Sequence, residues 1–227
     1  MSWQSTPYTI PLGITALIVA GLFAVTLTQR SQKGAYTMLG LFGAIVVWAG
    51  SYALQLASTV LGQALFWNTL RFAGPSLVTL AFIVFALQYT GRADLVTRRN
   101  VAVLAVVPVL TNVLVWTNYL GVHGLVRASA EMTTTGDLAR LTMTYGPWYY
   151  IHALYSLALS FAAIALFVGH WRRTSGQALR RTQLFTVGGV LPTVGTLFYA
   201  AELTAIDWGP VTYVVTACCL VVALFYY

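Results

Sequence analysis

Several ionisable side chains stand inside, or at the ends of, long apolar segments, where charged groups are unusual. Arg71 lies well inside one such segment, in the stretch Trp67-Asn68-Thr69-Leu70-Arg71. His152 lies about one helical turn into another segment, and Glu202 and Asp207 lie near the ends of two more. Because an ionisable group within a membrane is costly, each is a candidate functional residue.

Helical register groups these residues with aromatic neighbours. Residues three or four positions apart share a helix face, which gives three sets: Trp67, Arg71 and Gly74; Trp148, His152 and Tyr155; and Gly195, Tyr199 and Glu202. All three sets fall in the same half of the molecule if the segments are helices. The sequence therefore predicts a polar, aromatic-lined ligand site made of Trp67, Arg71, His152, Tyr155, Tyr199, Glu202 and Asp207.

Two interpretations of this group stay open. In the first, Arg71 pairs with Glu202, or meets an anionic ligand, in a pocket that opens to the outside. In the second, the aromatic residues form an interfacial belt, and an Arg71–Glu202 pair only holds two helices together. Trp148, Tyr149 and Tyr150 alone fit such a belt.

Other kinds of site find no support in the residue pattern. The one lysine, Lys33, lies outside the apolar segments, which excludes a retinal Schiff base in the last of them. His123, His152 and His170 lack metal-ligand spacing, and the sequence contains neither a protease-like Ser–His or Cys–His pattern nor a glycine-rich phosphate loop. We expect no catalytic residue, metal or cofactor in this chain, which is not itself an enzyme.

The composition identifies a membrane protein. Of the 227 residues, 59% are hydrophobic and 7% are charged, whereas soluble domains carry about 25% charged residues. This excludes a soluble enzyme, a disordered chain and a collagen-like fibre. We expect a multi-pass protein of the cell membrane that contacts lipid. In a membrane protein, the excess of basic residues behind the net charge of +7 serves to orient the helices in the membrane. We therefore expect no nucleic-acid partner.

Seven apolar runs are long enough to cross the hydrocarbon core, which takes about 20 residues. They lie near Thr9–Thr28, Tyr36–Ala57, Ala64–Gln88, Val101–Thr117, Trp148–His170, Gln183–Leu203 and Pro210–Tyr227. The short alternating runs of a membrane barrel do not occur. The fold class is therefore all-α, a single seven-transmembrane helix bundle over residues 1–227. The long link from Asn118 to Pro147 is predicted to form a small cap or hairpin.

The basic residues predict the orientation of the bundle. Nine of the 12 lie in alternate links, namely Arg30, Lys33, Arg92, Arg98, Arg99, Arg172, Arg173, Arg180 and Arg181. The positive-inside rule makes these links cytoplasmic, so the N-terminus is outside and the C-terminus inside. Pro75, Pro108 and Pro192 interrupt three of the spans, where a proline kinks a helix or frees a carbonyl.

Two parts of the sequence resemble each other, a similarity called the internal echo below, and they suggest a repeat. The stretch from Tyr52 to Leu56 matches that from Tyr199 to Leu203 in Tyr, Ala, Gln/Glu and Leu, and Gly74-Pro75 matches Gly209-Pro210. The two halves could be parallel repeats around the fourth span, a 3+1+3 plan. Chance similarity between Ala- and Leu-rich helices is the alternative.

Ordered motifs along the chain resemble a known family. Phe85-Ala86-Leu87-Gln88-Tyr89-Thr90-Gly91-Arg92 resembles the end of span 3 in the seven-transmembrane N-terminal region of archaeal and bacterial sensor histidine kinases. Pro108–Asn112, Thr117-Asn118 with His123-Gly124-Leu125, Gly146–Tyr155, Leu191-Pro192 and Asp207 fit the same family in order. The family often carries Glu where Gln55 stands, so a ligand role is not transferred to that position.

The resemblance implies a sensory input domain. A ligand or membrane stimulus would act on the outer half of the bundle, and helix 7 would pass the signal to a cytoplasmic kinase or other effector C-terminal to Tyr227. No such effector domain lies within this sequence, so we expect either an excised sensor region or further sequence downstream of Tyr227. The resemblance also implies a homodimer and an unidentified small ligand. A small-solute transporter of the 3+1+3 type and a membrane scaffold subunit are the alternatives. The transporter requires a polar inner pathway, and the scaffold requires no pocket.

Overall fold

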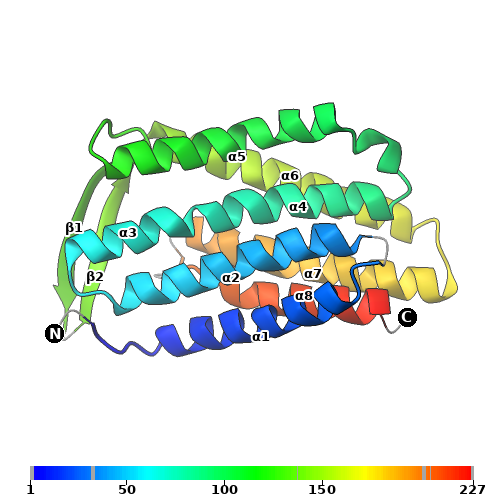
Figure 1. Cartoon of the computed structure of the whole chain (residues 1–227), viewed down its shortest axis with the longest axis horizontal. Helices are drawn as coiled ribbons and strands as arrows, with labels where there is room; N and C mark the ends of the chain where they lie inside the picture. Colours follow the sequence, from blue (N-terminus) through cyan, green and yellow to red (C-terminus); the bar gives the residue numbers. More distant parts are fainter. Residues whose placement is uncertain (1–2, 32–33, 137, 201–202, 205, 226–227) are drawn as a thin grey trace.

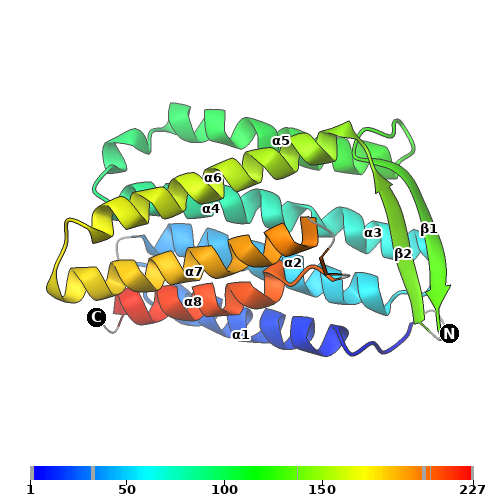
Figure 2. The same ribbon diagram turned by 180° about the vertical axis from the view of Figure 1, so that it is seen from behind.

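A computed structural model of the chain describes residues 3–31, 34–136, 138–200, 203–204 and 206–225. Long helices lie side by side, and a two-stranded hairpin crosses one end of the bundle (Figures 1 and 2). In chain order, the elements are α1 (Thr9–Thr28), α2 (Ala35–Ala57), α3 (Leu61–Arg71), α4 (Ala73–Tyr89), the short 3-10 helix η1 (Ala93–Leu95), α5 (Arg98–Tyr119), β1 (Arg127–Thr135), β2 (Leu138–Tyr145), α6 (Pro147–Trp171), α7 (Gly176–Ala200) and α8 (Gly209–Phe225).

The helices coincide with the predicted spans. The first has the predicted bounds, and α7 shows the largest shift, since it begins at Gly176 rather than near Gln183. Five described helical segments are long and apolar enough to cross a membrane, and the shorter α8 is also apolar. The segment of α7, whose first turns carry Arg180 and Arg181, is not among the five. The helical prediction is confirmed, and these segments fit a membrane protein.

The third predicted span is two helices rather than one. Helix α3 ends at Arg71 and α4 begins at Ala73, so Phe72 forms the junction. Pro75 explains the break because it has no N–H to donate to the carbonyl of Arg71 four residues earlier. The interruption predicted near Pro75 is therefore observed at Phe72. Pro108 and Pro192, in contrast, lie inside the continuous helices α5 and α7.

Six of the long helices form a closed ring. Going around it, α1 packs on α2, α2 on α4, α4 on α6, α6 on α7, α7 on α8, and α8 on α1. Helix α5 lies outside this ring, against α4 and α6. Side chains of the ring fill its interior, with Phe42, Phe82 and Phe167 among those that are buried.

A cluster of aromatic side chains packs inside the ring, in the half of the bundle nearer the described C-terminal end of the chain. Phe85 and Phe185 meet edge to face at 5.1 Å between ring centroids, and Tyr89 meets Phe185 at 4.5 Å. Phe167 lies within 6.3 Å of all three rings. Such edge-on pairs add to the stability that burial alone provides, so this half of the bundle has a dense core.

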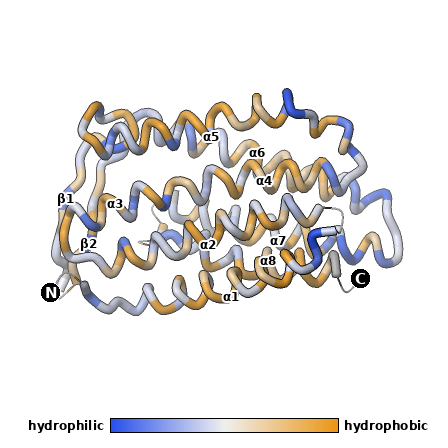
Figure 3. The backbone as a smooth tube through the Cα atoms, viewed as in Figure 1, coloured by the Kyte–Doolittle hydropathy of each residue, from blue (hydrophilic) through white to orange (hydrophobic). Residues whose placement is uncertain are grey.

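Charge separates along the long axis of the bundle. The links between α1 and α2, α4 and α5, and α6 and α7 all lie at the end where α8 finishes, and hydrophilic residues gather there (Figures 1 and 3). The hairpin and the described N-terminal residues lie at the opposite end. The described basic links thus lie at one end, as predicted, while Lys33 lies outside the described residues.

The hairpin predicted within the long link is present. Strands β1 and β2 pair antiparallel from Arg127↔Tyr145 to Thr135↔Leu138. Near its tip, the side chain of Gln4 holds the backbone of Ala139 by two hydrogen bonds, one donated at 2.6 Å and one accepted at 2.9 Å. The neighbouring Trp3 bridges to Ser58 after α2. The hairpin is thereby tied to the N-terminal segment across the bundle end.

Candidate functional site

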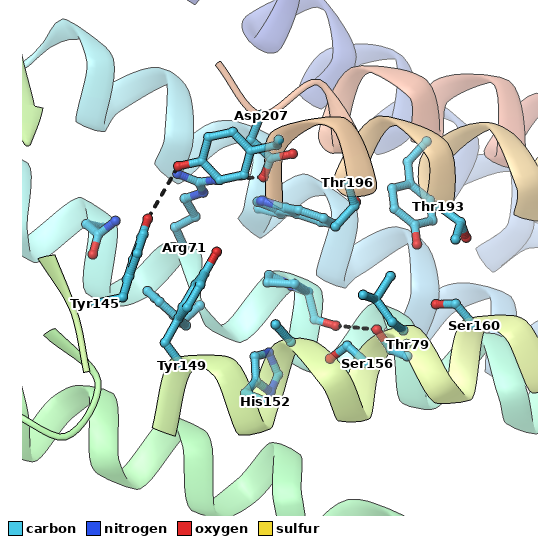
Figure 4. A pocket seen from close by; sticks show the side chains of 18 residues that line it. Arg71, Thr79, Tyr145, Tyr149, His152, Ser156, Ser160, Thr193, Thr196 and Asp207 are labelled. Carbon is cyan, nitrogen blue, oxygen red and sulfur yellow. Dashed lines mark hydrogen bonds and ion pairs between the residues drawn. The ribbon is translucent and has the colours of Figure 1, made fainter. Parts of the chain in front are cut away.

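A cavity lies inside the ring, in the half nearer the hairpin (Figure 4). Its volume is about 110 Å³, the same order as the ~150 Å³ engineered cavity that takes up benzene. Every element of the ring except α1 contributes to its wall, together with α3 and β2. The lining residues are Trp48, Asn68, Arg71, Phe72, Pro75, Thr79, Tyr145, Tyr149, His152, Ala153, Ser156, Leu157, Ser160, Thr193, Thr196, Tyr199, Asp207 and Tyr213.

A buried ion pair forms one wall of the cavity. Arg71 donates a hydrogen bond of 2.6 Å from Nη2 to Oδ2 of Asp207, and the two side chains are 10% and 5% exposed. The guanidinium also lies over the ring of Tyr52, 3.7 Å from its centroid, and 5.9 Å from that of Tyr199. Arg71 is therefore both paired and stacked. The sequence suggested Glu202 as its partner, but Glu202 lies outside the described residues.

Local structure fixes both members of this pair. Arg71 is the last residue of α3, at the break before Pro75. Asp207 stands two residues before α8, where its Oδ1 accepts a hydrogen bond of 2.9 Å from the backbone N–H of Gly209, and its own N–H donates to the hydroxyl of Tyr52. A carboxylate at a helix N-terminus is favoured by the helix dipole. Asp207 thus joins the start of α8 to the end of α3.

Hydroxyl groups of α6 and α7 also line the cavity. Ser156 and Ser160 follow His152 at four-residue intervals on α6, and Thr193 and Thr196 of α7 line the same cavity (Figure 4). Sequence analysis missed these residues and Tyr149, which it assigned to an aromatic belt. The sequence does show His152, Ser156 and Ser160 as a polar stripe at helical spacing, but it does not show which neighbour that stripe meets.

Most of the predicted face of α6 turns toward α5 instead. Trp148 donates a hydrogen bond of 3.0 Å from Nε1 to the hydroxyl of Thr111, and Tyr155 donates one of 2.7 Å to the carbonyl of Leu104. His152 lies 3.3 Å from the same Thr111 hydroxyl. Since that hydroxyl donates to Val107, its contact with His152 requires the Nδ1–H tautomer.

The predicted site residues therefore divide into three groups. Arg71, His152, Tyr199 and Asp207 line the cavity. Trp67 and Tyr155 do not: Trp67 packs against Phe66 at 5.1 Å between ring centroids, and Tyr155 faces α5. Both follow the helical register, but register alone does not say which neighbour a face meets. Glu202 remains outside the described residues.

Tyr145 covers the cavity from the hairpin. Its ring stacks on that of Tyr149 at 3.7 Å with an interplanar angle of 11°, and its hydroxyl lies 3.3 Å from that of Tyr199. Burial raises the pKa of Tyr145 above its ordinary value, so this phenol is neutral at physiological pH. The end of β2 is thus joined to α6 and α7.

Arg127 connects the base of the hairpin to the cavity wall. It is 5% exposed and donates hydrogen bonds to Asn68 Oδ1 at 2.6 Å, to Thr69 Oγ1 at 3.0 Å and to the carbonyl of Val115 at 3.3 Å. Burial lowers the pKa of Arg127 to about 10, which leaves it charged at neutral pH. Arg127 belongs to the long link from Asn118 to Pro147, and its burial depends on how the hairpin folds back.

Trp48 is held tightly at another wall. A Cβ on Gly74 would overlap the Cβ of Trp48, and a Cβ on Gly209 would lie 3.2 Å from its ring, so both glycines make room for this indole. Its Nε1 is buried and has no hydrogen-bond partner among the described residues. An unsatisfied buried donor costs about 1–3 kcal/mol.

The described residues contain no group of three or more His, Cys, Asp or Glu side chains that could hold a metal ion. The site is instead a small polar and aromatic cavity around one ion pair. Ligand sites inside helix bundles commonly have this form. Its arrangement suits reversible binding.

Comparison with known proteins identifies the family. A comparison with curated proteins found no match. The family model described as the N-terminal 7TM region of histidine kinase matches residues 11–227, nearly the whole chain. The family resemblance inferred from the motifs is therefore confirmed, and the chain belongs to the N-terminal seven-transmembrane regions of histidine kinases, the sensory input domains that are linked to a cytoplasmic kinase domain.

Proposed function

We propose that the cavity is the stimulus-binding site of this input domain, reached from the outer side of the cell membrane. The observation that carries the proposal is the Arg71–Asp207 pair, which lines the cavity and reaches the first turn of α8. A ligand beside this pair has a direct contact with the helix that leads toward the kinase domain. Membrane lipids and a second copy of the domain are its further proposed partners.

The proposed orientation places the hairpin outside and the end of α8 in the cytoplasm. Its support is the charge distribution, since the α4–α5 and α6–α7 links, which carry exposed Arg92, Arg98 and Arg172, lie at the same end as the described end of α8. Positively charged links are retained on the cytoplasmic side. The cavity then lies in the outer half of the bundle, and the aromatic cluster of Phe85, Phe167 and Phe185 lies in the inner half.

The closed inner half favours a receptor over a transporter. A transporter needs an inner pathway as polar as the outer one, whereas Phe85, Tyr89 and Phe185 pack edge to face across the corresponding region. The presence of a cavity equally disfavours a purely structural subunit. Both observations agree with the family assignment.

We also propose that the 3+1+3 repeat is real. In such a repeat, α1 corresponds to α6, α2 to α7 and α4 to α8. Rotating one half onto the other would then turn the contact between α1 and α8 into the contact between α6 and α4, and both contacts are present. The echo residues support this relation, since Tyr52 and Tyr199 both flank Arg71. Gly74 and Gly209 both make room for Trp48. The stimulus site would then lie between the two halves.

Signal passage would follow from a change at Asp207. A ligand shifts a conformational equilibrium only if it binds one state better than the other. A ligand that hydrogen-bonds Arg71 competes with the 2.6 Å contact to Asp207. The acceptor of the Gly209 N–H then moves, and with it the first turn of α8.

A cavity-filling variant tests the proposal. Ser160→Leu adds volume to the wall of the cavity, and Ala158→Leu makes a similar change two residues away at an exposed position on the same helix. We expect Ser160→Leu to fix kinase autophosphorylation in one state in liposomes, with the response to the native stimulus lost. Ala158→Leu should respond as the wild type does. Equal responses in both variants, each melting normally, would refute a sensory role for the cavity.

A further inference from the structure

We propose that the link between α6 and α7 binds the headgroup of an anionic phospholipid, whose acyl chain lies along the outer face of α7. The link lies at the end of the bundle opposite the hairpin, where α8 finishes (Figures 2 and 3). The inference therefore concerns a different part of the molecule from the cavity and does not depend on what the cavity does. In the proposed orientation, the lipid belongs to the cytoplasmic leaflet.

Four arginines flank this link without an acidic residue. Arg172 and Arg173 follow the end of α6, and Arg180 and Arg181 lie in the second turn of α7. The whole stretch from residue 138 to residue 201 contains no Asp or Glu, so the chain supplies no counter-charge within or near the link. In the part of the chain that the structure describes, none of the four arginines forms an ion pair. The link is therefore a positive surface that the described protein leaves unbalanced.

Helix dipoles compensate only half of this charge. The C-terminal end of α6 carries partial negative charge, which suits Arg172 and Arg173. The N-terminal end of α7 carries partial positive charge, and acidic residues are favoured there. Helix α7 has no acidic residue in its first turn, and Arg180 and Arg181 follow in the second. An anion bound at this position relieves repulsion within the link.

The accessibility of the arginines suits an external anion. Arg172, Arg173 and Arg180 are exposed, so their guanidinium groups can reach a headgroup phosphate. Arg181 is half-buried, and its Nε has no hydrogen-bond partner among the described residues. Its guanidinium has lost part of its hydration without gaining a described protein partner, which is unfavourable for a charge. Arginine matches phosphate well, because its planar fork donates two parallel hydrogen bonds.

An apolar stripe on α7 continues from Arg180 at helical spacing. Its members are between 40% and 50% exposed, namely Val187, Leu191, Val194 and Phe198. At 1.5 Å per residue, the stripe is about 16 Å long, which is close to half of the ~30 Å hydrocarbon core and hence to the depth of one leaflet. Trp171, which is 39% exposed, belongs to a residue type enriched at the headgroup level. A headgroup at the arginines and an acyl chain on the stripe therefore match a phospholipid in both polarity and length.

Aromatic packing holds the two sides of the link in place. The ring of Tyr89, at the end of α4, lies 5.6 Å from that of His170 in the last turn of α6 and 4.5 Å from that of Phe185 on α7, measured between centroids. One ring thus contacts both helices that carry the arginines. The headgroup surface is therefore built on two helix ends that pack on the same neighbour.

Lipid binding to the full-length kinase in detergent tests the proposal. Native mass spectrometry resolves each bound lipid, and the probes are phosphatidylglycerol and phosphatidylcholine with the same acyl chains. Both contain a phosphate, but only phosphatidylglycerol has a net negative charge. We expect it to bind about tenfold more tightly, since basic residues near a membrane surface favour anionic lipid. Equal affinities would overturn the anionic assignment. Millimolar inorganic phosphate should not displace the lipid, because it lacks an acyl chain, and displacement would overturn the lipid assignment.

A pair of double variants tests the position of the site. Arg180→Gln with Arg181→Gln removes two charges from the link and should weaken phosphatidylglycerol binding by about tenfold to thirtyfold. Arg98→Gln with Arg99→Gln is the matched control, since it also removes two neighbouring arginines, at the start of α5 and at the same end of the bundle. It should weaken binding less than about threefold, because the charge near the proposed site is unchanged. An equal loss in both would show that only the total charge of this end matters, and would overturn the site.

Arg180→Lys with Arg181→Lys separates charge from folding. It retains both positive charges and should bind phosphatidylglycerol within about threefold of the wild type. Binding as weak as that of the glutamine double variant would show that charge is not the cause, and would overturn the inference. These measurements involve no kinase activity, so their outcome is independent of the test of the cavity by Ser160→Leu.

Discussion

Arg71 and Asp207 form a buried hydrogen-bonded ion pair, although 136 residues separate them in the chain. Arg71 ends α3, and Asp207 precedes α8. Each lies just before a Gly-Pro pair of the internal echo, three residues before Gly74 and two before Gly209. If the proposed repeat is real, the pair joins nearly corresponding points of the two halves.

Asp207→Asn should destabilise the bundle severely. The substitution leaves the guanidinium of Arg71 buried without a counter-charge, and removing one partner of a buried pair costs about 3–5 kcal/mol. Thermal unfolding in detergent, followed by circular dichroism, measures the loss. Asp94→Asn in the exposed helix η1 removes the same charge and should leave the melting temperature unchanged.

Replacing both partners distinguishes charge from packing. The double variant Arg71→Met with Asp207→Leu removes both buried charges, and apolar replacement of such pairs is often neutral or stabilising. We expect it to be more stable than Asp207→Asn alone. If the double variant is the less stable of the two, the pair acts through its contacts with Tyr52 and Gly209 rather than through charge balance.

Gly74→Ala should be destabilising despite the better helix propensity of alanine. Its new Cβ would overlap Trp48, whose neighbouring atoms belong to the α2 backbone and cannot easily move. Overpacking of this kind costs about 1–3 kcal/mol. Gly50→Ala, on α2 with no atom within 4 Å of the added Cβ, is the matched control and should melt at or above the wild-type temperature. Equal melting of the two variants contradicts the close contact between α2 and α4.

Gln4→Ala should loosen the tip of the hairpin without unfolding the bundle. It removes the two hydrogen bonds to Ala139, each worth about 0.5–1.5 kcal/mol. Hydrogen exchange at the Ala139 amide should become roughly tenfold faster, which corresponds to about 1.4 kcal/mol of local opening. Exposed Gln177 supplies the control, since Gln177→Ala should leave hairpin exchange unchanged.

Tyr145 should contribute through its ring more than through its hydroxyl. Tyr145→Ala removes the stack on Tyr149 and should cost about 3–5 kcal/mol, as for other large aromatic truncations. Tyr145→Phe retains the stack, loses only the contact with Tyr199, and should cost about 1 kcal/mol. Unfolding of both variants in urea measures these differences.

The pH dependence of Tyr145 has a definite sign. Burial raises the pKa of this phenol in the folded protein, while the unfolded value is about 10. The stability that comes from the protonated phenol is therefore fully present below about pH 10 and is lost as the pH rises above that value. The difference between wild type and Tyr145→Phe should be constant between about pH 6 and 9. A change within that range would contradict a buried neutral phenol.

Helix positions followed directly from the sequence, because long apolar runs have few other structures available in a membrane. Arg71 was equally visible as a charge inside such a run. Its partner was not, since the sequence suggested Glu202 or an anionic ligand, and the contact with Asp207 depends on how the segment before α8 folds. Tyr149 and Ser160 were missed because the sequence could not show which side of α6 meets the cavity and which meets α5.

The distance between Arg71 and Asp207 along the chain also concerns how the protein is made. At about 5–20 residues per second, translation reaches Asp207 roughly 7–27 s after Arg71, so the guanidinium is made before its counter-ion. Tyr52 precedes Arg71 in the chain, and its ring lies 3.7 Å from the guanidinium. That ring is the partner that can shelter the charge during insertion, until the last helix arrives and completes the bundle.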